Sequence, residues 1–141
     1  MYSVSTEGSF DAAHFLKNYN GKCKNINGHR WRVVVQVSST SLLKDQQNQG
    51  MVTDFKDVKE ILNQLLDTFD HTLIYEKDSL KPTLKSLLLE EDFALREVDF
   101  RPTAENFSKY FFEELSKRMS VSMVSVYETP NNCATYTVAK E

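Results

Sequence analysis

The chain has 141 residues, of which 40% are hydrophobic and 11% aromatic. This composition supports an ordinary apolar core in a single domain spanning residues 1–141, and it excludes a chain that is mainly disordered. The net charge is −3, so the chain lacks the overall basic charge of a nucleic-acid-binding domain, and we expect no nucleic-acid partner.

The first half of the chain predicts two strands and a helix. Residues 1–15 are predicted to form a strand ending in Phe10-Asp11-Ala12-Ala13-His14, before a polar turn. Residues 29–39 alternate, with His29, Trp31 and Val33 on one face, which is typical of a strand. Residues 55–69 carry apolar side chains at helical spacing, and Asp54 is the expected N-cap.

The second half predicts a helix followed by a hairpin. Residues 76–101 are the least regular, and Leu84 to Leu89 fit either a short helix or a loop. A helix is expected over 103–119, then strands over 121–128 and 133–139. This order predicts an α+β fold with a four-stranded antiparallel sheet and two helices on one face. The edges of so small a sheet can be covered by association between copies.

Three features predict the compartment. The first 15 residues lack the basic and apolar regions of a secretory signal, and the longest apolar runs are far too short to span a membrane. Cys23 and Cys133 do not form a disulfide framework. We therefore expect a cytoplasmic protein with no membrane partner.

The histidines of the two first strands suggest a metal site. Position 27 lies on the same strand face as His29, and antiparallel pairing can bring His14 beside that face. Three imidazoles there would form a zinc site with an open fourth position, but residue 27 is Asn. Two histidines on strands are also commonly ordinary half-buried residues, so the spacing alone leaves both interpretations open.

Other groups could carry chemistry, each with a plainer alternative. Cys23 could act as a base if a nearby cation lowered its pKa, or it could be an idle surface thiol. Asp70 could charge His71 for proton transfer, or His71 could simply follow a helix C-terminus. Glu128 could accept paired hydrogen bonds from a guanidine-like heterocycle edge, or it could be a solvated residue at a strand end.

Taken together, several motifs carry a resemblance that covers nearly the whole chain. They are Phe10-Asp11-Ala12-Ala13-His14, Cys23-x3-Asn27-Gly28-His29, Asp70-His71-Thr72-Leu73-Ile74, Pro102-Thr103-Ala104-Glu105-Asn106 and Tyr127-Glu128-Thr129. Their order and spacing resemble the 6-pyruvoyl-tetrahydropterin synthase family. The three residues between Cys23 and position 27 favour its bacterial branch, the 6-carboxy-5,6,7,8-tetrahydropterin synthases of queuosine (7-deazaguanine) biosynthesis.

The resemblance implies a fold, an assembly and a reaction. The fold is the tunnelling fold, which assembles into trimeric barrels or hexamers with active sites between subunits. The reaction is the zinc-dependent conversion of 7,8-dihydroneopterin triphosphate to 6-carboxy-5,6,7,8-tetrahydropterin, acetaldehyde and triphosphate, catalysed by a carbon–carbon lyase. The partners implied are this small-molecule substrate and further copies of the chain.

The resemblance also implies three groups of site residues. One zinc ion per subunit would be held by His14, Asn27 and His29. Cys23 would be the general base, with Asp70 and His71 tuning it and carrying protons. Glu128 would pair with the amino-pyrimidine edge of the pterin, and Thr103 and Glu105 would lie near the pterin or the interface.

Asn27 departs from the family pattern, which has a third histidine at this position. An amide oxygen suits harder cations than zinc, so we expect weakened zinc binding and impaired turnover. Two explanations stay open: a substitution introduced to block turnover, which the otherwise intact motifs favour, or a natural homologue with a weakened or repurposed metal site. The alternative functions are a 6-pyruvoyl-tetrahydropterin synthase and a non-catalytic oligomer that binds a pterin or purine.

Overall fold

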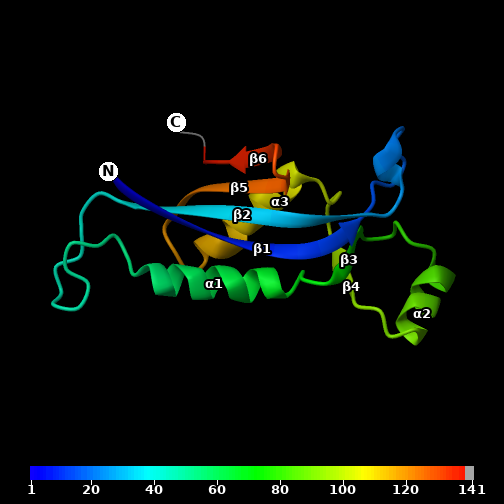
Figure 1. Cartoon of the computed structure of the whole chain (residues 1–141), viewed down its shortest axis with the longest axis horizontal. Coiled ribbons are helices and arrows are strands. Elements are labelled where there is room, and N and C mark those ends of the chain that lie inside the picture. Colours follow the sequence, from blue (N-terminus) through cyan, green and yellow to red (C-terminus); the bar gives the residue numbers. More distant parts are fainter. Residues whose placement is uncertain (139–141) are drawn as a thin grey trace.

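The computed structural model describes residues 1–138. Figure 1 shows a long, curled sheet with one helix below it, one helix behind it and a further helix at one end. In chain order the elements are β1 (Tyr2–His14), the short 3-10 turn η1 (Lys22–Lys24), β2 (Asn27–Ser39), α1 (Phe55–Asp67), β3 (Thr72–Glu76), α2 (Pro82–Glu90), β4 (Leu95–Val98), α3 (Ala104–Ser116), β5 (Val121–Thr129) and β6 (Asn132–Tyr136).

The long β1–β2 hairpin is the centre of the sheet. The two strands pair antiparallel over their whole length, with Phe10 opposite Trp31 and His14 opposite Asn27. Since successive side chains point to opposite faces, Phe10, His14 and Trp31 share the buried face. The predicted alternation of these strands is confirmed, and it directs the histidines toward the core.

The sheet is larger than the predicted four antiparallel strands. It has six strands in the order β4-β3-β1-β2-β5-β6, and β3 pairs parallel with both β1 and β4. The prediction of an all-antiparallel sheet is therefore wrong, while the α+β class is confirmed. β6 ends at Tyr136 rather than at 139, and residue 139 lies outside the described residues.

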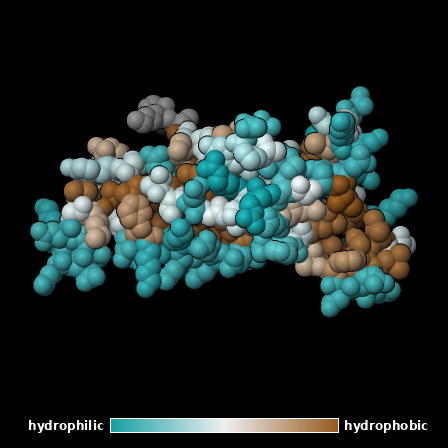
Figure 2. Space-filling model, viewed as in Figure 1, coloured by the Kyte–Doolittle hydropathy of each residue, from teal (hydrophilic) through white to brown (hydrophobic). Residues whose placement is uncertain are grey.

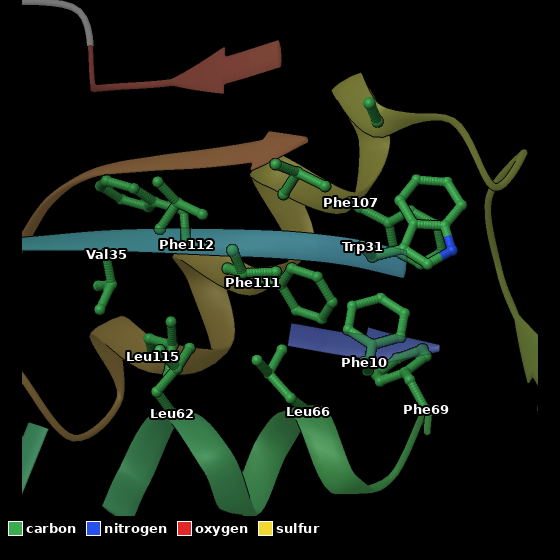
Figure 3. Packing of buried hydrophobic residues seen from close by; sticks show 14 of the residues in the cluster. Phe10, Trp31, Val35, Leu62, Leu66, Phe69, Phe107, Phe111, Phe112 and Leu115 are labelled. Carbon is green, nitrogen blue, oxygen red and sulfur yellow. The ribbon is translucent and has the colours of Figure 1, made fainter. Parts of the chain in front are cut away.

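Two helices cover one face of this sheet, as predicted. α1 begins after Asp54, whose side chain accepts a hydrogen bond from the Lys56 backbone N–H, and α3 begins after Thr103, which caps Asn106 in the same way. α1 ends at Asp67, two residues before the predicted end, and α3 ends at Ser116, three residues before it. Figure 3 shows their apolar side chains meeting those of the hairpin; the labelled residues are Phe10, Trp31, Val35, Leu62, Leu66, Phe69, Phe107, Phe111, Phe112 and Leu115.

The third helix, α2, was the ambiguous segment of the sequence. Pro82 stands at its first turn, where a missing N–H costs nothing. Leu84, Leu87 and Leu89 of this helix stay exposed, and brown side chains gather at this end of the molecule in Figure 2. Among the helices of residues 1–138, none is both long and apolar enough to cross a membrane.

Candidate functional site

The open end of the β1–β2 hairpin brings three predicted residues together. His14 ends β1 and Asn27 begins β2 directly opposite it, while His29 lies two residues further along β2. The Asn27 Oδ1 atom is 3.1 Å from His14 Nε2 and 2.6 Å from His29 Nε2. The antiparallel register therefore places two imidazole nitrogens around one amide oxygen.

Glu128 joins this cluster from the neighbouring strand. It lies near the end of β5, just past the last residue pair between β5 and β2, Tyr127 with Arg32. Its Oε1 atom is 3.0 Å from His29 Nε2 and 3.5 Å from His14 Nε2. The sequence suggested Glu128 for the substrate but gave no sign that its carboxylate would lie against the histidines.

The orientation of His14 is fixed by a backbone carbonyl. Its side chain is about 98% buried, and Nδ1 lies 2.7 Å from the Pro102 carbonyl oxygen. A carbonyl only accepts, so Nδ1 carries a hydrogen, and Nε2 of the ring faces Asn27 and Glu128. The Trp31 ring stands perpendicular to the His14 ring, with centroids 4.9 Å apart, and holds it in place.

The Asn27 amide is oriented just as firmly. Its Nδ2 donates to the Asn25 carbonyl at 2.8 Å and to the His14 carbonyl at 3.4 Å. Because both partners are acceptors, the amide nitrogen must face them, and Oδ1 must face the imidazoles. The turn before β2 thus presents the oxygen of Asn27, rather than its nitrogen, to the cluster.

Electrostatics favour a neutral His29. Burial lowers the pKa of this imidazole and nearby His14 lowers it further, while the Glu128 carboxylate opposes both effects. A neutral imidazole keeps the lone pair that a metal ligand needs.

The cluster fits a divalent cation. His14, His29 and Glu128 each offer one donor atom within 4.8 Å of the others. Ligand bonds of about 2.0–2.2 Å place neighbouring donors about 3.0–3.5 Å apart in octahedral or tetrahedral geometry. The distances from Glu128 and Asn27 to the two imidazoles, between 2.6 and 3.5 Å, bracket that range. The residues present therefore suit a metal held by nitrogen and oxygen ligands.

A cleft of about 470 Å³ has His29 and Glu128 in its wall. Its other lining residues include Arg30, Arg32 and Tyr127, which alternate with His29 and Glu128 along β2 and β5 and so belong to the opposite face of the sheet. The Arg32 guanidinium lies 3.8 Å from the centre of the Tyr127 ring. This volume lies within the range of small-molecule sites. A flat, hydrogen-bonding ligand with an anionic group would match this lining.

Asp70 and His71 form a second cluster. The Asp70 carboxylate accepts the Asp11 backbone N–H at 2.8 Å and lies 2.8 Å from His71 Nδ1. The Asp11 N–H is the main cause that lowers the pKa of Asp70, followed by the hydrogen bond to His71. His71 has a φ of 58°, a left-handed conformation that costs most residues free energy.

This second cluster lies beside an ion pair of the β1–β2 hairpin. Asp11 pairs with Arg30 in the register and binds its guanidinium through two hydrogen bonds, which also lowers the pKa of Asp11. Asp11 and Arg30 alternate with Ala12 and His29 along their strands, so they lie on the opposite sheet face. The pair Asp70–His71 is bonded to this segment, since Asp70 accepts the Asp11 backbone N–H and the His71 backbone N–H donates to the Asp11 carbonyl.

Cys23 is not joined to either cluster. It lies in η1, half-buried and unbonded to another cysteine, and its carbonyl accepts the Leu16 N–H. Among residues 1–138, its thiol makes no hydrogen bond to Asp70 or His71.

The remaining predicted residues lie at the start of α3. The Thr103 hydroxyl caps the helix, and Glu105 is exposed in its first turn. The preceding Pro102 carbonyl is the group that orients His14. Sequence reasoning missed this role, because a backbone carbonyl leaves no mark in residue type.

Comparison with known proteins places this site in context. The family model described as 6-pyruvoyl tetrahydropterin synthase matches residues 3–139. A relative from Haemophilus influenzae named 6-carboxy-5,6,7,8-tetrahydropterin synthase is 36% identical, covering 96% of this chain and 99% of the relative. A relative of the same name from Synechocystis is 34% identical, covering 82% of this chain and 98% of the relative.

Solved structures show the same fold. An uncharacterized protein from Wolinella succinogenes has a TM-score of 0.81 and 22% identity, with 96% of this chain and 97% of that chain covered. The 6-pyruvoyl tetrahydropterin synthase of Caenorhabditis elegans has a TM-score of 0.68 and 27% identity, with 98% and 96% covered.

Proposed function

The chain belongs to the 6-pyruvoyl tetrahydropterin synthase family, and from this premise we propose that it is a 6-carboxy-5,6,7,8-tetrahydropterin synthase. The reaction is the conversion of 7,8-dihydroneopterin triphosphate to 6-carboxy-5,6,7,8-tetrahydropterin, acetaldehyde and triphosphate, a lyase step in queuosine biosynthesis. The relatives that carry this name support the assignment. The observation that carries it is the convergence of His14, His29 and Glu128 beside a cleft.

The proposed cofactor is one zinc ion per subunit, held by His14, His29 and the amide oxygen of Asn27. Bound zinc supplies a Lewis acid toward the hydroxyl and carbonyl oxygens of the substrate side chain. Both imidazoles are already oriented, one by the Pro102 carbonyl and both by packing against Trp31. An amide oxygen binds zinc less well than an imidazole, so we expect lower turnover than a three-histidine site would give.

Proton transfer falls to Cys23, Asp70 and His71. Cys23, as a thiolate, would remove a proton from the substrate side chain. Asp70 would orient His71 through the 2.8 Å contact to Nδ1, and the two residues together would tune Cys23 and carry protons. The strained backbone of His71 supports a functional role, because strain at an exposed residue serves no packing purpose.

Substrate binding falls to Glu128 and the cleft. The carboxylate would pair with the amino-pyrimidine edge of the pterin through two hydrogen bonds. Arg30 and Arg32 line the same cleft; each is paired with a carboxylate of β1, Asp11 and Glu7 respectively, and would exchange this partner for the triphosphate. Thr103 and Glu105, at the start of α3, would lie at the edge of this site or at a subunit interface.

A homo-oligomer with shared active sites is the proposed assembly, a trimer or hexamer. Membership of the family supports it, and in such an assembly Asp70 and His71 of one copy would serve the Cys23 of a neighbouring copy. The exposed leucines of α2 and the sheet edges at β4 and β6 are further surfaces that association would cover. Free cysteines suit the reducing cytoplasm, which is the proposed compartment.

Mixed oligomers test the shared site. Cys23→Ala and His71→Asn homo-oligomers should both be inactive, whereas co-refolded mixtures should regain about a quarter of the native sites, since those combine an intact Cys23 with an intact neighbouring His71. Activity absent from every mixture would place the whole catalytic group in one chain.

The products of 7,8-dihydroneopterin triphosphate decide between the candidate functions. We expect acetaldehyde and 6-carboxy-5,6,7,8-tetrahydropterin to form in equal amounts. Formation of 6-pyruvoyl-tetrahydropterin without acetaldehyde would make the chain a pyruvoyl-type synthase. Binding of the pterin without any product would make it a non-catalytic pterin-binding protein.

A further inference from the structure

The donor cluster at the end of the hairpin directs four atoms toward one point. The Pro102 carbonyl fixes the His14 ring, and the Asn25 carbonyl fixes the Asn27 amide, so that His14 Nε2 and Asn27 Oδ1 face each other at 3.1 Å. Glu128 Oε1 lies 3.5 Å from His14 Nε2 and 3.0 Å from His29 Nε2. One donor atom each from His14, His29 and Glu128 lies within 4.8 Å of the others, a spacing at which a single cation can be shared among them.

We propose that Glu128 is a metal ligand in the substrate-free protein and compensates for the weaker bond that Asn27 makes to the metal. Its Oε1 lies within 3.5 Å of both imidazole nitrogens, on the side that β5 presents to them. The ligand set becomes two imidazoles, a carboxylate and an amide oxygen. The proposal builds on the synthase assignment, in which Glu128 contacts only the pterin.

The composition of this ligand set alters metal preference. Three neutral imidazoles favour zinc and leave the centre with the full charge of the ion. A carboxylate removes one unit of that charge, and two oxygen ligands suit harder divalent ions such as Mn²⁺ and Fe²⁺. We therefore expect the preference for zinc over manganese to be smaller in this chain than in its Asn27→His variant.

Glu128 then cannot bind the metal and the pterin edge at the same time. Paired hydrogen bonds to a pterin edge need both carboxylate oxygens, whereas the substrate-free structure directs one of them at His14 and His29. The side chain is 27% exposed at the wall of the cleft, so it can turn toward an entering ligand. Pterin binding would thus withdraw the carboxylate and leave its place beside the imidazoles to the substrate.

A double-mutant cycle on metal affinity tests the proposal. Zn²⁺ and Mn²⁺ dissociation constants are measured by competition dialysis on the native oligomer, Glu128→Gln, Asn27→His and the double variant. In the native background Glu128→Gln should weaken Zn²⁺ binding by about tenfold or more. In the Asn27→His background the same change should have little effect, because three imidazoles then hold the ion. Glu113→Gln, an exposed change on α3, should leave affinity unchanged in both.

Two results would overturn it. An unchanged affinity of Glu128→Gln in the native background would remove Glu128 from the ligands. An equal loss in both backgrounds would show a general effect of negative charge rather than ligation.

Cobalt spectroscopy gives an independent readout. The visible bands of the Co²⁺-loaded native protein should shift on addition of neopterin toward those of Co²⁺-loaded Glu128→Gln, because both lose the carboxylate. Bands that neopterin leaves unchanged would refute the exchange. A failed cycle together with acetaldehyde release would leave the synthase assignment intact, while a successful cycle without product would remove the synthase assignment alone.

Discussion

The variant His71→Asn distinguishes the effect of His71 on turnover from its effect on the stability of the fold. Asparagine tolerates the left-handed conformation better than histidine does, and its amide can still donate to Asp70. The φ of 58° and the 2.8 Å contact to Asp70 are thus both retained. What the substitution removes is the titratable ring.

The expected effect on stability is small. Left-handed strain costs a non-glycine residue about 1 kcal/mol, part of which Asn recovers. His71 is 79% exposed and Asp70 38%, so losing the charged contact costs less than about 1 kcal/mol. The relief of backbone strain and the loss of the charged contact oppose each other, so the melting temperature should change by only about 5 °C or less.

The expected effect on turnover is large. Loss of a proton-transferring group lowers the rate by about 10²–10⁴-fold. Acetaldehyde release measured beside the melting curve checks both quantities, and Asp92→Asn, at another left-handed residue, is the matched control that should keep native activity. If the turnover of His71→Asn stays within about fivefold of the native value, His71 is not a proton-transferring group. A collapse of stability would show that the ring has a structural role.

Three further predictions concern the core, the base and a carboxylate. Gly8→Ala puts a Cβ 2.9 Å from Asn63 Oδ1 and 3.0 Å from Leu66 Cδ1, so denaturant titration should show a loss of about 1–3 kcal/mol in the free energy of unfolding. Gly28→Ala, with open space around its Cβ, is the control and should show no loss. Equal losses in the two variants would contradict the close packing of α1 against β1. Cys23→Ala should abolish acetaldehyde release while gel filtration shows an intact oligomer, with the exposed Cys133 as the control position; retained turnover would exclude Cys23 as base. The hydrogen bond from the Asp11 N–H and the contact to His71 hold the pKa of the Asp70 carboxyl below its ordinary value of 3.8 in the folded chain. Its contribution to the free energy of unfolding is therefore present above the pKa of the unfolded chain and is lost as the pH falls through the pKa of the folded chain. Asp70→Asn should destabilise the chain at neutral pH and match the native stability in acid, and a stability difference that stays constant with pH would contradict the lowered pKa.

The long elements of the fold were predictable because their patterns repeat. β1 and β2 each have 13 residues, enough alternation to identify both the strand and its buried face. β3 and β4 have five and four residues, too few to distinguish from the helix and turns around them. Their parallel pairing depends on contacts between distant segments, which no local pattern records.

The site was predictable in its residues but not in its contacts. The motifs pointed to His14, Asn27 and His29, and the strand register explains why they meet. The approach of Glu128 depends on how β5 leaves β2 after Tyr127, and the orientation of His14 depends on the Pro102 carbonyl. Both are tertiary features.

Acetaldehyde release per bound metal is the measurement that tests the synthase assignment most directly. The native chain and its Asn27→His variant are loaded with zinc, their metal content per subunit is determined, and each is given 7,8-dihydroneopterin triphosphate. We expect both to release acetaldehyde together with the 6-carboxy product, the variant faster because it has a third imidazole. If both hold metal and bind the substrate yet neither releases acetaldehyde, the chain is not a 6-carboxy-5,6,7,8-tetrahydropterin synthase.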